Sequence, residues 1–313
     1  MNEVMKMQSP SVYEVMAALC TEYRVHEIPD SSRAWNGPQV IPDSDTICNK
    51  VMTATDASLE VIHRAIDEGA DLLVVHHGLT WTLGAIPLPS SNEVEAERVR
   101  VAIANNLAIL ALHLPMDAHP ILGNNAVLAD SLGIQRDGTW FASKGHPSPL
   151  DSSLIQGSSM TTEWPQIDTL EDGRLTMEIG LHGRFSTSMN RNEIKKRIRH
   201  ILGKEQTEPE ITRIFPEDRG MESDEIETIA ICSGAAGGAV IDAKELGVDA
   251  LLSGEGPFQS AILAQEAAIS LILAGHHATE TVGPRATADW LNRIAEANGW
   301  SMSAHFISAP IGL

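Results

Sequence analysis

The chain has 313 residues, a length that suits two domains or one large α/β unit. With 43% hydrophobic and 20% charged residues, its composition is that of a globular protein and excludes wholesale disorder. The formal net charge of −20 disfavours direct binding to nucleic acid, whose phosphates it would repel, and it suits metal cations.

Nothing in the sequence indicates a membrane span or export. No apolar run reaches the roughly 18 residues that a transmembrane helix needs, and the first residues lack the apolar stretch of a signal peptide. The three cysteines, Cys20, Cys48 and Cys232, are scattered and odd in number, so we expect no disulfide framework and no Cys-x-x-Cys zinc site. These features predict a cytoplasmic protein.

The first regular elements lie in the N-terminal half. Helical spacing is present at 10–24, where Ser9 or Ser11 supplies the cap. Residues 25–45 are rich in Pro, Asp and Ser, and we expect an irregular segment with a binding loop at 35–37. Strands at 48–55, 70–77 and 107–113 then alternate with helices at 57–69, 92–106 and 124–134.

The same alternation returns after residue 225. Strands are predicted at 226–234, 248–254, 269–277 and 301–309, with helices at 239–247, 257–268 and 280–298. Continuous aliphatic strands that alternate with amphipathic helices predict an α/β fold of mostly parallel sheets with flanking helices.

The central part of the chain has a different character. Residues 141–224 begin with a stretch rich in Pro, Ser, Asp and Gly and include a basic helical stretch at 192–200, which we interpret as a solvated helix face. We therefore expect a metal-binding α/β core formed by 1–140 and 225–313. A smaller central α+β lobe or insertion would occupy 141–224.

Residues of the types that bind metals come immediately after four of the predicted strands. These side chains are His76, His77, His113, Asp117, Glu255, His276, His277 and Glu280. Because the carboxyl ends of parallel strands form the ligand-binding edge of a sheet, we expect them to meet at one edge. Adjacent strand residues point to opposite faces, so His76 and His77 would diverge unless the strand ends there, as Gly78 suggests.

This set of side chains is suited to a pair of metal ions. Two neighbouring imidazoles with a bridging carboxylate can hold two ions about 3.5–4 Å apart, and mixed His and carboxylate ligation suits Zn, Mn or Fe. Each motif alone has a plainer interpretation, since the histidines could be core residues and Asp117 could cap a turn. Similarly, the glycine-rich stretch after Cys232 is either a tight turn or a phosphate loop. Only the joint pattern indicates a metal site.

Four segments resemble the Nif-three-like dinuclear metal-centre family, whose members are commonly named GTP cyclohydrolase 1 type 2 homologs. They are HHGLTW (76–81), HLPMDAHPILGNNAVLAD (113–130), VDALLSGE (248–255) and GHHATETVGPRA (275–286), and WNGPQV (35–40) and TATDAS (53–58) fit as well. The resemblance covers most of the chain outside about 141–224. It implies a Nif-three-like α/β fold, a toroidal homohexamer and two divalent metal ions per subunit.

The resemblance also implies roles for individual residues. The ligands would be His76, His77, Asp117, His276 and Glu280, with Glu280 as the bridge between the ions. His113 would be a hydrogen-bonding or acid/base residue near the site. Beyond the resemblance, metal-dependent hydrolysis would use His113 or Glu255 to move protons. Arg285 is a candidate contact for substrate phosphate, because a protein this acidic needs local positive charge to bind a triphosphate. No ligand role is assigned to His277.

The function that these roles favour is metal-dependent hydrolysis of a small molecule. If the family's name applies, the substrate is a nucleotide, GTP, whose imidazole ring is opened with release of formate. Two alternatives stay open. One is a dinuclear phosphoesterase or amidohydrolase, and the other is a metal-binding regulator or scaffold without turnover.

Overall fold

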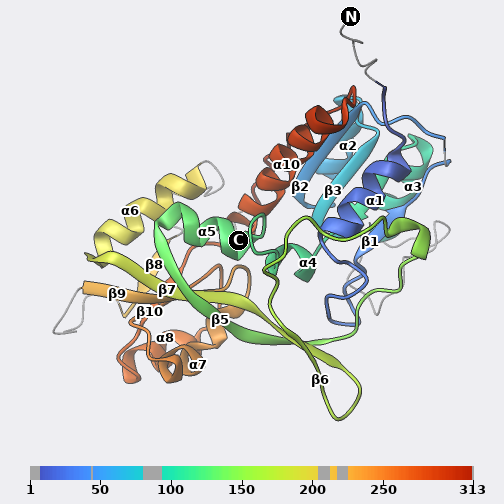
Figure 1. Cartoon of the computed structure of the whole chain (residues 1–313). Coiled ribbons are helices and arrows are strands. Elements are labelled where there is room, and N and C mark those ends of the chain that lie inside the picture. Colours follow the sequence, from blue (N-terminus) through green and yellow to red (C-terminus); the bar gives the residue numbers. More distant parts are fainter. Residues whose placement is uncertain (1–7, 44, 80–93, 204–211, 217–224, 312–313) are drawn as a thin grey trace, which may run out of the picture. The chain divides into compact units, whose positions relative to one another are not determined.

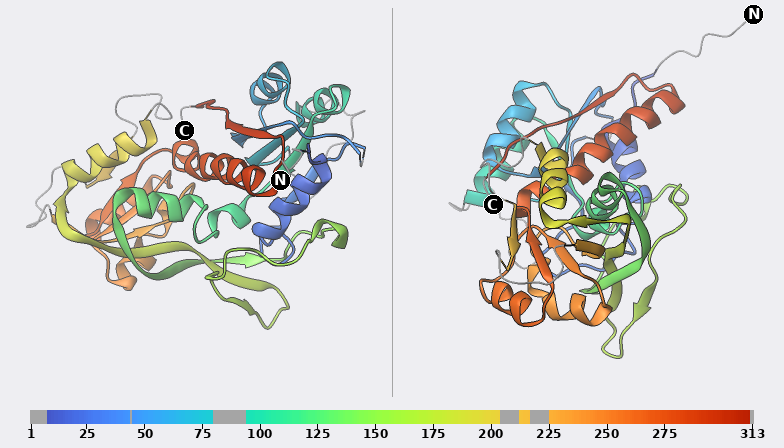
Figure 2. Two further views of the ribbon diagram at one scale, coloured as in Figure 1. Left: turned by 45° about the horizontal axis from the view of Figure 1, so that its top comes forward. Right: turned by 90° about the vertical axis from the view of Figure 1, so that its left-hand side faces the viewer.

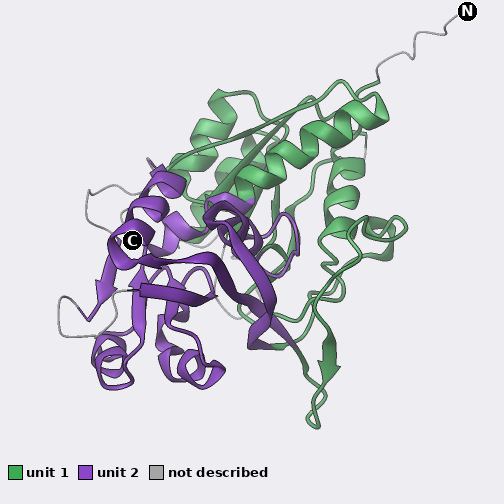
Figure 3. Ribbon diagram, turned by 60° about the vertical axis from the view of Figure 1, so that its left-hand side comes forward, with its two compact units in different colours: residues 1–116, 144–176, 284–309 green, residues 117–143, 177–283, 310–313 purple. Residues whose placement is uncertain are grey.

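The computed structural model describes residues 8–43, 45–79, 94–203, 212–216 and 225–311 (Figure 1). The chain forms two compact units, each made of several segments (Figure 3). The first unit contains residues 1–116, 144–176 and 284–309, and the second contains 117–143, 177–283 and 310–313. The segment 141–224, which we expected to form a central lobe, therefore contributes residues to both units.

The first unit is built on a five-stranded sheet in the order β1-β4-β3-β2-β12. The strands are β1 (Gly37–Val40), β2 (Lys50–Asp56), β3 (Leu72–His77), β4 (Ala108–Ala111) and β12 (Ser303–Phe306). Strands β12, β2, β3 and β4 are parallel, as predicted, and β1 is antiparallel to β4. We had expected the region of β1 to be irregular, and Pro38 and a register shift before Val40 explain why no strand pattern marks it.

Helices cover both faces of this sheet (Figure 2). On one face, α2 (Leu59–Asp67) and α3 (Val94–Ala104) share a buried cluster with the aliphatic side chains of β2, β3 and β4. On the other lie α1 (Val12–Glu22) and α10 (Val282–Asn298), where the Tyr23 hydroxyl is 2.7 Å from that of Thr287. The hydroxyl of Thr53 on β2 donates to the Pro284 carbonyl over 2.8 Å, which ties α10 to the sheet.

A seven-stranded sheet forms the basis of the second unit, in the order β5-β7-β9-β10-β11-β8 with β6 paired to β7. Strands β9, β10 and β11 are parallel, whereas β7 is antiparallel to β9 and β8 to β11. The bounds are β5 (Ile134–Gly145), β6 (Ile167–Thr169), β7 (Leu175–Asn190), β8 (Arg213–Phe215), β9 (Glu225–Ile231), β10 (Ala250–Ser253) and β11 (Ser270–Leu273). Strand β6 and the end of β5 belong to the first unit.

Two pairs of helices flank this second sheet (Figure 1). Helices α5 (Asn124–Leu132) and α6 (Arg191–Leu202) bury aliphatic side chains against one face, and α7 (Val240–Leu246) and α8 (Gln259–Glu266) cover the other. Helix α6 buries Ile194, Ile198 and Leu202, so the basic stretch at 192–200 is the solvated helix face that we expected. The remaining elements are short: α4 (Leu114–Asp117), α9 (His276–Thr279) and the 3-10 turns η1 (Ser152–Leu154) and η3 (Ala236–Gly238).

The expected α/β architecture is confirmed, with parallel strands at the centre of each sheet. In the described part of the chain, every helix is too short or too polar to cross a lipid bilayer. The predicted strand ends do not share one edge, because β3 and β4 belong to one sheet and β10 and β11 to the other. The candidate ligands therefore fall into two sets, one in each unit.

Candidate metal centre

The first set of candidate ligands begins with the histidine pair that ends β3. His76 is fully buried, and its Nδ1 donates to the carbonyl oxygen of Leu112 over 3.0 Å. His77 is paired in register with Asp56, the last residue of β2, and its Nδ1 is 2.7 Å from the Asp56 carboxylate. Asp56 falls in the TATDAS stretch, but sequence reasoning gave it no role. Thr80 and Trp81 of the HHGLTW motif lie outside the described residues.

The two rings remain close although β3 does not end before them. The strand extends through His77 and ends before Gly78, as predicted. The ring centroids are nevertheless 4.6 Å apart with the planes tilted by 46°. His76 turns toward β4 and His77 toward β2, each held by its own oxygen partner. Because their rings are so close, the two side chains reach one region although they start on opposite faces of the sheet.

His113, just after β4, completes this first set. Its Nδ1 is 2.8 Å from an oxygen of Asp30, and its backbone N–H donates to the side-chain oxygen of Asn36 over 2.6 Å. Asp30 is almost fully buried and also accepts hydrogen bonds from the Asn36 amide and the Leu114 N–H. Burial raises the pKa of Asp30, but His113 and these hydrogen bonds lower it by a larger amount. The net shift of the pKa is downward, so the carboxylate is ionised.

These three imidazoles fit a divalent metal ion. One ring nitrogen from each of His76, His77 and His113 lies within 4.8 Å of the others. In each ring Nδ1 faces an oxygen that can only accept, so Nδ1 carries a proton, and in the neutral ring Nε2 is the atom with the lone pair. Metal-binding histidines are oriented in this way in proteins. The chemistry of the donor set therefore suits Zn, Mn or Fe.

In the second unit, Asp117 is held by three buried polar residues. One oxygen of its carboxylate accepts from the Asn124 amide over 2.8 Å and from the Ser233 hydroxyl over 3.0 Å. Asn125 donates to the Asp117 backbone carbonyl and accepts from the Ser233 N–H. Both asparagines begin α5 and are fully buried. Sequence reasoning missed this support, although two adjacent amides at the start of a buried helix are a signal that could have found it.

His276 lies between two carboxylates of the same unit. Its Nδ1 is 2.8 Å from Glu255, and its Nε2 is 3.2 Å from Glu280. Burial lowers the pKa of His276, but Glu280 and then Glu255 raise it more, to about 9. Glu280 is buried, whereas Glu255 is exposed. Glu255 thus orients His276 through Nδ1, as Asp56 and Asp30 orient His77 and His113.

The turn after β9 makes room for Glu280. Gly234 has a φ of +65°, and a Cβ added to it would lie 2.2 Å from a Glu280 carboxylate oxygen. The stretch after Cys232 is therefore a tight turn between β9 and η3, and its glycine is needed against a candidate ligand. Burial, with the charges of Asp117 and Glu280, raises the pKa of the Cys232 thiol well above its usual value.

Two further predicted positions lie apart from these contacts. Arg285 is exposed on α10, and its guanidinium stacks 4.1 Å above the centroid of the Phe306 ring of β12. His277, to which no ligand role was assigned, is buried on α9. His119 is a buried histidine that sequence reasoning did not single out, and its Nδ1 accepts the backbone N–H groups of Ile121 and Leu122. Its tautomer is therefore opposite to that of the three histidines of the first unit.

Comparisons with known proteins find relatives over most of the chain. A protein of Halobacterium salinarum named GTP cyclohydrolase 1 type 2 homolog is 30% identical over 302 residues, 96% of this chain and 99% of its own length. One of the same name from Escherichia coli K12 is 32% identical and covers 90% of this chain and 91% of its own.

Solved structures match over almost the whole chain. A structure described as protein ybgI, of unknown function, has a TM-score of 0.74 and 26% identity, covering 97% of this chain and 100% of its own. The structure of TTHA1606 from Thermus thermophilus has a TM-score of 0.68 and 26% identity, with the same coverage. The family described as Duf34/NIF3 (NGG1p interacting factor 3) matches residues 11–310. Because the family model spans residues 11–310 and the relatives cover most of the chain, this chain belongs to the Duf34/NIF3 family.

Proposed function

We propose that this chain is a dinuclear divalent-metal protein whose ligands are His76, His77, Asp117, His276 and Glu280. The observation that carries the proposal is the common orientation of the histidines, each with Nδ1 directed to an oxygen. Buried carboxylates, Asp117 and Glu280, supply the anionic ligands that a pair of divalent ions requires. Zn, Mn and Fe are the ions that this donor set favours.

The proposed reaction is metal-dependent hydrolysis. Two bound divalent ions would supply Lewis acidity and a water whose pKa is near neutrality. His113, fixed by Asp30, can accept or return a proton at Nε2. Glu255 was expected to move protons, but its contact with Nδ1 of His276 favours a positioning role.

We propose GTP as the first substrate to test, with opening of its imidazole ring and release of formate. The names of the relatives support this choice, and the exposed guanidinium of Arg285 is a contact for phosphate. The net charge of −20 means that a nucleotide triphosphate needs such local positive charge to bind.

The test is to load the purified protein with Zn, Mn or Fe and to measure formate released from GTP. We expect the His113→Gln variant to lose formate release. The control is Asp137→Asn, which removes a carboxylate from an ion pair with Arg184 on the second unit, and it should keep formate release. Phosphate release instead of formate would indicate a phosphoesterase, and cleavage of a dipeptide panel an amidohydrolase. A protein that is fully loaded with metal but turns over none of these substrates would support the hypothesis of a regulator or scaffold.

We also propose that the chain assembles as a toroidal homohexamer in the cytoplasm. The family resemblance supports the assembly, and the three buried free cysteines are compatible with a reducing compartment. Light scattering on the eluted protein tests the assembly, since a monomeric or dimeric mass would contradict it.

A further inference from the structure

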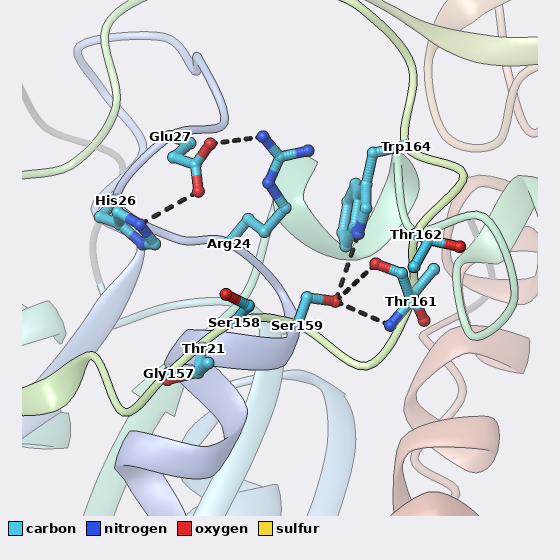
Figure 4. Close-up of a pocket in the computed structure, with 10 residues that line it drawn as sticks. All are labelled: Thr21, Arg24, His26, Glu27, Gly157, Ser158, Ser159, Thr161, Thr162 and Trp164. Carbon is cyan, nitrogen blue, oxygen red and sulfur yellow. Dashed lines mark hydrogen bonds and ion pairs between the residues drawn. The ribbon is translucent and has the colours of Figure 1, made fainter.

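A cavity in the first unit shares no residue with the candidate metal ligands. It has a volume of about 490 Å³, within the range of small-molecule sites, and it lies between the turn after α1 and the segment 157–164 (Figure 4). Its lining includes Arg24, His26, Glu27, Ser158, Thr162 and Trp164.

One wall of this cavity is a fixed network of hydrogen bonds. Buried Glu22, on α1, accepts the N–H of Met160 over 2.7 Å and the hydroxyls of Thr161 and Ser159 over 2.8 and 3.2 Å. The Ser159 hydroxyl in turn accepts the indole N–H of Trp164 over 3.3 Å. The segment that carries Trp164 is therefore attached to α1 before any ligand binds, which reduces the entropy cost of binding.

The opposite wall carries a charged pair with a strained backbone. Arg24 has a φ of 46°, in the left-handed region that side chains other than glycine rarely adopt. Its guanidinium bonds to Glu27 and lies beside the Trp164 ring (Figure 4), 5.4 Å from the ring centroid. Glu27 also lies 3.1 Å from Nε2 of His26, and the Arg24 hydrogen bond is the largest of the influences that lower the pKa of Glu27.

The charges in the cavity decide which class of ligand fits. The cation of Arg24 and the anion of Glu27 cancel, so the lining offers strong donors and acceptors without net charge. The hydroxyls of Ser158 and Thr162 add groups that both donate and accept, and the indole supplies a flat apolar surface. Among the described residues, Nδ1 of His26 is buried without a hydrogen-bond partner. The chain's overall charge of −20 opposes anions.

We propose that this cavity binds a neutral polyhydroxylated small molecule through a vicinal diol. A diol places two hydroxyls side by side, which matches the paired oxygens of a carboxylate and the fork of a guanidinium. The diol could be that of a free sugar or of the ribose of a nucleoside. This site is independent of the proposed metal-dependent reaction, because none of its residues is a candidate ligand or proton carrier.

Saturation-transfer NMR on the full chain tests the proposal with four probes: D-ribose, adenosine, 2′,3′-dideoxyadenosine and inorganic phosphate. We expect transfer to at least one of the first two and none to the dideoxy compound. Binding of ribose alone assigns the site to sugars, and binding of adenosine alone assigns it to nucleosides. Equal transfer to adenosine and its dideoxy analogue, or binding of phosphate without the diols, would overturn the proposal.

Matched variants place the binding in this cavity. Glu27→Gln keeps the side-chain shape but removes the charged acceptor, so we expect the diol to bind roughly tenfold more weakly. Glu60→Gln makes the same change in an exposed Arg–Glu pair of the first unit, where Glu60 lies 3.6 Å from Arg64. This variant should bind the diol as the unchanged protein does. Binding that is equal in both variants would show that the cavity is not the site. Unchanged circular dichroism of Glu27→Gln confirms that the variant is folded.

Discussion

Nδ1 of His113 lies 2.8 Å from Oδ2 of Asp30, a carboxylate that is only 1% exposed. The same carboxylate oxygen accepts from the Asn36 amide, and Asn36 in turn accepts the backbone N–H of His113. The ring of His113 is thus fixed in orientation and in tautomer by residues that are 77 and 83 positions away in the sequence. Nε2 is left with its lone pair for the proposed chemistry.

We predict that Asp56→Asn weakens metal binding by roughly 10- to 100-fold, the usual effect of losing a group that orients a metal-binding histidine, because Asp56 holds Nδ1 of the proposed ligand His77. An amide can present its N–H₂ to Nδ1 and favour the wrong tautomer of His77. Competition with a fluorescent chelator measures the dissociation constant. Asp137→Asn, which breaks the ion pair with Arg184 at 2.9 Å, is the control and should bind metal normally. Equal affinity in both variants would contradict the role given to Asp56.

The second prediction concerns pH. The folded pKa of His276 is raised from 6.5 to about 9 in the metal-free protein, because Glu280 and Glu255 outweigh the effect of burial. A pKa that is raised by folding stabilises the folded state. The stabilisation is fully present at pH values below the pKa of the unfolded chain, and it is lost as pH rises through the pKa of the folded chain. The free energy of unfolding of the metal-free chain should therefore fall between about pH 6.5 and about pH 9.

Urea unfolding of the metal-free protein across this interval, compared with His276→Gln, provides the measurement. The difference in unfolding free energy between the two proteins should shrink as pH rises, because only the unsubstituted chain loses the protonated imidazole. A difference that stays constant across the interval would mean that His276 does not titrate there.

Gly234 provides a third prediction. An alanine there would have to adopt a φ of +65° and to displace Glu280, because its Cβ would lie 2.2 Å from the Glu280 carboxylate oxygen. Gly247→Ala is a matched control, since Gly247 has a φ of +84° and its Cβ would meet nothing within 4 Å. Each substitution should cost roughly 1–2 kcal/mol of stability for the left-handed backbone.

Only Gly234→Ala should also reduce metal binding, because it moves a candidate ligand. Thermal unfolding with and without added Zn or Mn separates the two effects. The increase in Tm on metal addition should be kept in Gly247→Ala and largely lost in Gly234→Ala. An equal increase in both variants would show that Glu280 is not a ligand.

The fourth prediction is a change in stoichiometry. If Glu280 bridges two ions, Glu280→Gln should no longer hold two metal ions per chain, whereas Glu296→Gln, an exposed change on α10, should hold the full complement. Elemental analysis after removal of loosely bound metal gives the ratio. Two ions per chain in Glu280→Gln would show that the ligand assignment is wrong.

The sequence predicted the fold well because its signals are local. Aliphatic runs such as residues 72–75 and 250–252 are typical of buried strands, and α2 shows clear amphipathic spacing. The strand β1 was missed because Pro38 and an irregular register leave no alternating pattern. The division into units was not evident in the sequence, because each unit combines segments that are distant in the chain.

The candidate ligands were predictable because they directly follow strands. The residues that orient them were not, since Asp30 precedes His113 by 83 positions and lies in a segment without a regular pattern. Asp56 could have been inferred from its place at the end of β2, next to the strand that carries His77. The expectation of one common edge failed because similar strand patterns do not reveal which sheet a strand joins.

The most direct test of the central claim is anomalous scattering from crystals of the protein loaded with Zn or Mn. The account predicts two peaks per chain about 3.5–4 Å apart. The coordinating side chains should be His76, His77, Asp117, His276 and Glu280, with Glu280 in contact with both ions. A single peak, or peaks held by other residues of the fully loaded protein, would contradict the account.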